Sequence, residues 1–154
     1  MRGTLIGICV GVVGMIVLGF LGSSAAAPPH EPSTDTRQRL VLAPTQRDMM
    51  LTEMRQMLGS LSGIMRSLAA NDLPAAEKAT RAAGMMHAAD VDPQIQKLLP
   101  QQFLDLAMHT HMGFDKLADQ IKAGGGRDDT LRGLATLTGN CMACHAMYRL
   151  DEAR

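Results

Sequence analysis

Three residues with reactive side chains lie close together near the end of the chain. They are Cys141, Cys144 and His145, in the pattern C-x-x-C-H. Thiols and an imidazole at this spacing suit three chemistries: a zinc site, a redox dithiol or structural disulfide, and covalent attachment of haem. In the third, the two thiols form thioethers with the haem vinyl groups and the imidazole of the next residue ligates the iron.

The surrounding sequence favours attachment of a haem. A structural zinc site needs four ligands, usually with a second Cys or His pair, and no second cysteine pair is present. His109 and His111 are two residues apart, which separates them by about 200° around a helix. A redox C-x-x-C normally begins a helix of an α/β fold, whereas this one is predicted to lie deep in a helix. We therefore expect one covalently bound haem c per chain, with iron as the metal.

Helical segments are predicted to position this motif. They run from about Thr45 to Ala70, from about Pro74 to Ala88, from about Pro100 to Ala123, and from Asp128-Asp129 into the motif. Thr45 is the predicted N-cap of the first. Its apolar residues recur at spacings of four and three, typical of a seam between helices: Met50, Met54, Met57, Leu61, Ile64 and Leu68.

The last predicted helix has a stripe of its own, made of Leu131, Leu134, Thr138, Cys141, His145 and Tyr148. No segment has the pattern of a strand. Short connections between four helices predict an all-α, antiparallel up-down-up-down four-helix bundle with a covalently attached haem c.

The N-terminal residues 1–27 indicate export. Arg2 precedes an apolar run from Leu5 to Leu21, and small residues follow it, as in a signal peptide. The alternative is a retained membrane anchor, since about 18 apolar residues can just cross a bilayer. Either reading places the rest of the chain in the periplasm, as a soluble protein or as one tethered to the inner membrane. Residues 28–43 are expected to form a proline-rich linker, from which Leu40 to Leu42 can pack on the cytochrome domain, residues 44–154.

The bulk composition excludes some functions. The formal net charge is zero and the pI is near 7, which argues against binding to nucleic acid. The sequence contains no nucleophile beside a base, no recognisable acid pair and no phosphate-binding glycine loop. We therefore do not expect an enzyme.

The stretch "CMACHAMYR", at the end of four predicted helices, resembles the class II cytochromes c, which comprise the cytochrome c-prime family and its low-spin relatives. The resemblance covers about Thr45 to Leu150. The motif followed by Tyr and Arg is its specific part. It implies a four-helix bundle, often a homodimer, with Cys141 and Cys144 as thioether cysteines and His145 as the proximal ligand. Arg149, one helical turn past His145, would match the family's arginine beside the proximal imidazole.

Two functions are distinguished by whether a protein side chain binds the iron on the face opposite His145. An iron with a second protein ligand suits one-electron transfer to a redox partner protein, and a five-coordinate iron binds NO or CO. Only Met147 follows the motif, too close to reach the opposite face, so a second ligand must lie upstream. Candidates in the predicted bundle are Met49, Met50, Met54, Met85, Met86, His87, Met108, His109, His111 and Met112. Because the resemblance places the distal residue at about this depth of the first helix, we expect Met54 as the second ligand, with Met50 next. His111 shares a face with Ala107, Phe114 and Ala118 and is expected to point inward.

Overall fold

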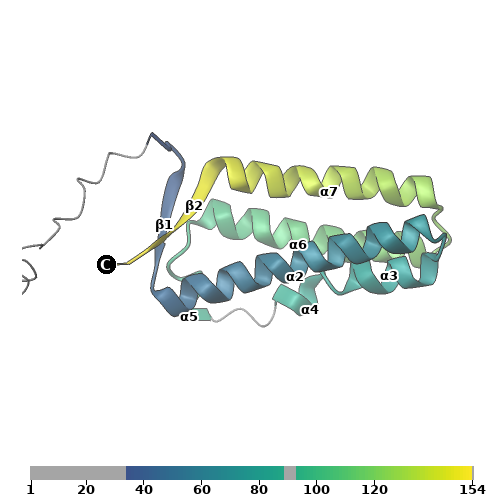
Figure 1. The fold of residues 1–154 in the computed structure, drawn as a ribbon, viewed down its shortest axis with the longest axis horizontal. Helices are drawn as coiled ribbons and strands as arrows, with labels where there is room; N and C mark the ends of the chain where they lie inside the picture. The colour runs from purple at the N-terminus through teal and green to yellow at the C-terminus, as the bar shows by residue number, and fades with distance from the viewer. Residues whose placement is uncertain (1–33, 89–92, 154) are drawn as a thin grey trace, which may run out of the picture. The chain divides into compact units, whose positions relative to one another are not determined.

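The computed structural model describes residues 34–88 and 93–153 (Figure 1). The predicted signal or anchor segment, residues 1–27, and the first part of the predicted linker lie outside these residues. The fold given below is that of the unit that begins at Thr36.

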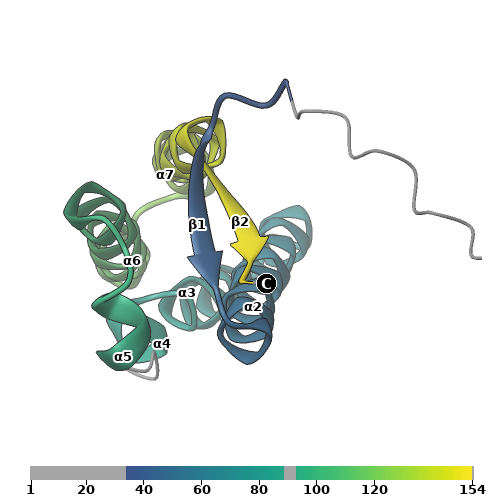
Figure 2. The same cartoon turned by 90° about the vertical axis from the view of Figure 1, so that its left-hand side faces the viewer.

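This part of the chain is mostly helical, as predicted. The longer helices are α2 (Pro44–Ala69), α3 (Leu73–Arg81), α6 (Gln101–Lys122) and α7 (Arg127–Met147), and the short ones are α4 (Met85–Ala88) and α5 (Pro93–Gln96). Helix α2 packs against α3, α3 against α6, and α6 against α7 (Figures 1 and 2). Gly113 lets α6 approach α7, because a Cβ atom at this position would meet the side chain of Leu137.

Helix α2 begins one residue earlier than expected, and the predicted N-cap Thr45 is wrong. Pro44 occupies the first turn, where its fixed φ is already helical and its missing N–H costs no hydrogen bond. Ala43 is the N-cap, and its backbone N–H donates to the Gln46 side chain at 3.1 Å.

The predicted continuous helix from Pro74 to Ala88 is interrupted after Arg81. Gly84 lies against the side chain of Asp115, where any Cβ atom would collide with the carboxylate. The same carboxylate accepts a hydrogen bond from the backbone N–H of Met85 at 2.8 Å, at the start of α4. A contact with α6 therefore ends one helix and begins the next.

The expectation that the chain has no strand is wrong. Strands β1 (Gln38–Leu42) and β2 (Tyr148–Glu152) pair in parallel, with Gln38 opposite Tyr148 and Leu42 opposite Glu152. Figure 2 shows them lying across one end of the helices. Leu40 and Leu42 are buried while their neighbours are exposed, which is the alternation of a half-buried strand. Residues 38–42, expected in the linker, are therefore part of the folded unit.

Two apolar clusters form the core. The first lies among α2, α3, α6 and α7 and contains Ile64, Leu68, Ala76, Ala83, Phe114, Leu117, Ile121, Leu134 and Leu137. The second lies at the end that carries the strands and contains Leu40, Leu42, Met50, Ile95, Leu99, Phe103 and Tyr148. Within the second cluster, the rings of Phe103 and Tyr148 meet edge to face with centroids 5.4 Å apart.

Candidate functional site

The C-x-x-C-H residues lie together on the last two turns of α7. Cys141 and Cys144 are half-buried and are not joined in a disulfide, whereas His145 is exposed. Burial raises the pKa of the Cys141 thiol, and burial followed by the charge of Cys141 raises the pKa of Cys144. Both cysteines are therefore neutral thiols at neutral pH.

The interior side of the motif is apolar. Cys144 packs against the second cluster, and Met54 and Met147 pack against the same cluster. Met54 is half-buried, and Met50, the next candidate, is 6% exposed within the cluster. The sequence thus identified two methionines of α2 that share an apolar environment with Cys144.

The predicted stripe on α7 is correct only in part. Leu134 is buried as expected, but Leu131 is 44% exposed, and Thr130 and Leu137 are buried instead. In this part of α7 the buried positions therefore come one residue earlier than predicted, at Thr130 and Leu137. His145 lies on the exposed side of the helix.

Arg149 does not lie on the helix, as had been expected from its position one turn past His145. Helix α7 ends at Met147, and Tyr148 has extended backbone angles because its ring turns into the second cluster. Arg149 therefore lies in β2 opposite Arg39, with Nη2 3.8 Å from Asp151 Oδ2. Its predicted place beside the imidazole of His145 stays a prediction.

His111 points inward, as predicted, but both ring nitrogens face protein atoms. Nδ1 lies 2.8 Å from the Ala83 carbonyl oxygen and Nε2 lies 3.5 Å from Glu53 Oε1. Burial lowers the pKa of His111, but Glu53 and the Ala83 carbonyl outweigh burial and raise the pKa above its usual value. The imidazole thus links α2, α6 and the segment before α4, which gives it a structural role.

Several other upstream candidates lie on the surface. Met49, Met86, Met108, His109 and Met112 are exposed, and Met85 is half-buried. The side chain of His87 lies outside the described residues.

Sequence reasoning missed one contact of the motif. The Nη1 atom of Arg37 donates a hydrogen bond to the backbone carbonyl of His145 at 3.1 Å, and Arg39 is ion-paired with Asp151 nearby. The residues that precede β1 therefore hold the end of α7. The sequence does contain a pattern that could have indicated this contact, because two arginines, Arg37 and Arg39, lie next to the apolar residues Leu40 to Leu42.

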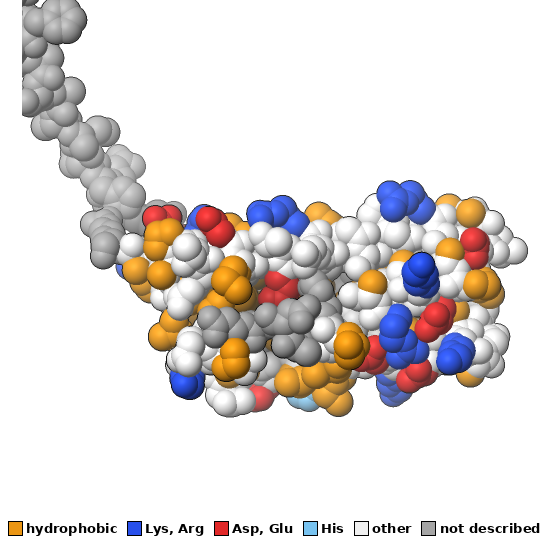
Figure 3. Space-filling view, turned by 90° about the horizontal axis from the view of Figure 1, so that it is seen from below, with side chains coloured by type: hydrophobic (Ala, Val, Ile, Leu, Met, Phe, Trp, Pro, Cys, Tyr) orange, Lys and Arg blue, Asp and Glu red, His pale blue; other side chains and the backbone are white. Residues whose placement is uncertain are grey.

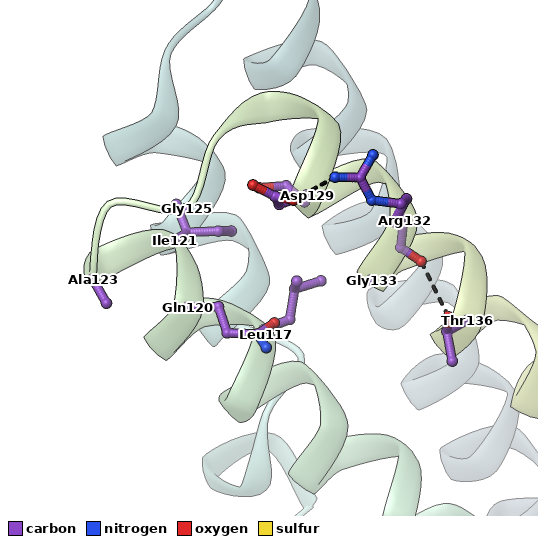
Figure 4. Close-up of a pocket in the computed structure, with 10 residues that line it drawn as sticks. Leu117, Gln120, Ile121, Ala123, Gly125, Asp129, Arg132, Gly133 and Thr136 are labelled. Carbon is purple, nitrogen blue, oxygen red and sulfur yellow. Dashed lines mark hydrogen bonds and ion pairs between the residues drawn. The ribbon is translucent and has the colours of Figure 1, made fainter.

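A cavity of about 520 Å³ lies at the turn between α6 and α7 (Figure 4). Its lining includes Asp129, which is ion-paired with Arg132, and Thr136, which donates to the carbonyl of Arg132 at 3.1 Å. These residues lie toward the start of α7, whereas the motif lies at the end of that helix. The lining contains no cysteine or histidine, so the cavity is separate from the candidate site.

The side chains of Cys141, Cys144 and His145 are of the types that a covalently attached haem needs. In residues 34–88 and 93–153, no group of three or more His, Cys, Asp or Glu side chains could hold a metal, so the ligands that a zinc site needs are not assembled there. A haem brings four nitrogen ligands of its own and needs only the two thiols and one imidazole. These three side chains are adjacent, accessible and beside an apolar cluster.

Within the described part of the chain, no helix has both the length and the apolar character needed to cross a membrane.

Comparisons with known proteins give no match: no family model, no curated protein and no solved structure is similar to this chain.

Proposed function

We propose that the protein is a periplasmic class II cytochrome c that transfers single electrons. The observation that carries the proposal is the placement of Cys141, Cys144 and His145 on the last two turns of α7, beside an apolar cluster. Helices α2, α3, α6 and α7 would form the four-helix bundle of this class. The bound haem would supply a one-electron Fe(II)/Fe(III) couple.

Each site residue has a distinct role in this proposal. Cys141 and Cys144 would hold the haem through thioethers, and the imidazole of His145 would ligate the iron. The thioether of Met54 would supply a second ligand to the iron, which is supported by the apolar cluster that Met54 and Cys144 share. By the resemblance, Arg149 would stand beside the proximal imidazole. The apolar cluster limits water at the site, which tunes the reduction potential.

The partners follow from the same proposal. Electrons pass to and from a redox partner protein, and no residue of the chain performs catalysis. A retained N-terminal segment would tether the unit to the inner membrane, and two chains could form a homodimer as in the resembled class.

One observation favours gas binding as the second candidate function. His111 is engaged by Glu53 and Ala83, and His109 is exposed. If Met54 is only a core residue, neither of these histidines is poised to replace it. A five-coordinate iron that binds NO or CO would follow.

The test begins with the purified protein. A haem that stays on the chain in a denaturing gel, and is lost when Cys141 and Cys144 are both replaced by Ser, is the expected result. A chain without bound haem would overturn both functions. The spin state of the ferric iron then separates them: low spin supports electron transfer, and high spin with ready CO binding supports gas binding.

A further inference from the structure

The last turn of α7 leaves one backbone carbonyl of the motif without its helical partner. Helix α7 ends at Met147, and the backbone N–H of Tyr148 still donates to the carbonyl of Cys144. The next carbonyl is that of His145, whose partner in a continued helix would be the backbone N–H of Arg149. Arg149 is extended in β2, so the helix itself cannot satisfy this carbonyl.

Arg37 supplies a donor to this carbonyl from the other end of the unit. Its Nη1 atom donates to the His145 carbonyl at 3.1 Å, across 108 positions of the sequence. The parallel register explains how Arg37 reaches this place, because Gln38 pairs with Tyr148 and Arg37 directly precedes Gln38. A cation at the C-terminal end of a helix also interacts favourably with the helix dipole. Arg37 therefore caps the C-terminal end of α7 from a distant segment.

The arginines of the two strands have a different partner. Arg39 is ion-paired with Asp151 of β2, and Nη2 of Arg149 lies 3.8 Å from Oδ2 of the same carboxylate. These two arginines connect the strands to each other, whereas Arg37 contacts the motif.

The side chain of His145 is not held by packing in the core. It is exposed, whereas the neighbouring Cys144 packs against the second cluster. The position of an exposed imidazole depends on the backbone that carries it. The hydrogen bond from Arg37 is made to the backbone of His145 itself, so it acts directly on that position.

We propose that Arg37 is a positioning residue for His145 and that its positive charge raises the reduction potential of the iron. This inference rests on the proposed function, in which the imidazole of His145 ligates the iron. Net charge and hydrogen bonds around the ligands of a metal set its reduction potential. Fe(II) carries one positive charge less than Fe(III), so a guanidinium beside the ligating residue favours the reduced iron.

The test compares Arg37→Met with Arg37→Lys by redox titration of the purified protein. Methionine keeps most of the aliphatic stem but removes the charge and the donor, whereas lysine keeps both. We expect Arg37→Met to lower the reduction potential and Arg37→Lys to restore most of it. The shift should shrink at high salt, because exposed charges are screened. An unchanged potential in Arg37→Met, equal shifts in the two variants, or a shift that salt does not reduce would overturn the inference.

Hydrogen exchange gives a second readout that needs no haem. Amides 145–148 report on the last turn of α7, and their exchange should be about two- to fivefold faster in Arg37→Met, the loss expected when a cation at a helix C-terminus is removed. Unchanged exchange would show that Arg37 does not position His145. A purified chain that carries no haem would instead overturn the proposed function, and with it the role of Arg37 toward the iron. The absorption spectrum distinguishes these two failures.

Arg132→Met is the matched control. Arg132 is an exposed arginine of α7 that is ion-paired with Asp129 near the start of the helix. On the face shown in Figure 3, Lys and Arg side chains lie over both ends of the unit, so the loss of one positive charge is also tested away from the motif. Arg132→Met should leave the potential and the exchange of amides 145–148 unchanged. A shift as large as that of Arg37→Met would mean that only the total charge matters, which contradicts the inference.

Discussion

Cys144 and His145 lie on either side of the boundary between the apolar interior and solvent. Cys144 packs against the second cluster, and the next residue is exposed. One helical step of about 100° separates their side chains. Their co-location with Cys141 could be predicted, because a helix fixes neighbours by local spacing alone. The contact between His111 and Glu53 could not be predicted from the sequence, because Glu53 belongs to a different helix and only tertiary packing brings the two side chains together.

At Met54, the proposal predicts a spectroscopic change. Because a thioether bound to ferric iron gives a sulfur-to-iron charge-transfer band, Met54→Ala should abolish that band and raise the spin state. Absorption spectra of the oxidised protein measure both effects. Met57→Ala is the matched control, because Met57 is a half-buried methionine of α2 that packs against the first cluster. Unchanged spectra in Met54→Ala would exclude Met54 as a ligand.

The environment of His111 predicts that the stability of the protein depends on pH. The pKa of this imidazole is raised in the folded protein, where Glu53 and the Ala83 carbonyl outweigh burial. Its contribution to stability is therefore complete below the unfolded pKa of about 6.5 and is lost as pH rises through the folded pKa. The free energy of unfolding in urea should fall as the pH rises above about 6.5. Glu53→Gln should flatten this dependence, and an equally steep dependence in that variant would contradict the assignment.

Among the elements, the helices were predictable and the strands were not. Helices α2 and α6 begin and end within about two residues of the predicted positions, and α7 begins within about two residues of its predicted start, because their apolar spacings are local signals. Strands β1 and β2 are five residues each and pair from opposite ends of the unit. Neither has a partner nearby in sequence, so no local pattern could indicate the pairing. The break at Gly84 was missed for a similar reason, since Asp115 of α6 causes it.

A pair of substitutions in β1 tests whether this strand belongs to the folded unit. Leu42 is 1% exposed, so Leu42→Ala should lower the free energy of unfolding by about 2–5 kcal/mol through lost burial and a residual cavity. Val41 is 50% exposed on the same strand, and Val41→Ala should cost less than about 1 kcal/mol. Urea denaturation followed by circular dichroism compares the two. Equal, small effects would mean that residues 38–42 behave as a linker.

Across the whole unit, the two apolar clusters define two regions, and only the second would gain contacts from the proposed haem. The first cluster is closed by α2, α3, α6 and α7 and contains no residue of the motif. Cys144 and Met147 pack against the second cluster, together with both strands. Attachment of a haem should therefore stabilise the second region most.

Hydrogen exchange measures this difference amide by amide. Replacing Cys141 and Cys144 by Ser should speed exchange in β1, β2 and α5, while α3 largely keeps its protection. The effect arises because a group bound at the motif adds contacts only to the second cluster. A uniform loss of protection in both regions would show that the unit opens as one cooperative structure.

The parallel pairing of β1 and β2 also has a mechanical consequence. A force that pulls the two ends of the unit apart acts on β1 at Gln38 and on β2 at Glu152, and these are the opposite ends of the paired stretch. The strands would then slide along each other, so that their hydrogen bonds share the load instead of breaking one by one. The parallel pairing therefore resists tension that is applied to the two ends of the unit.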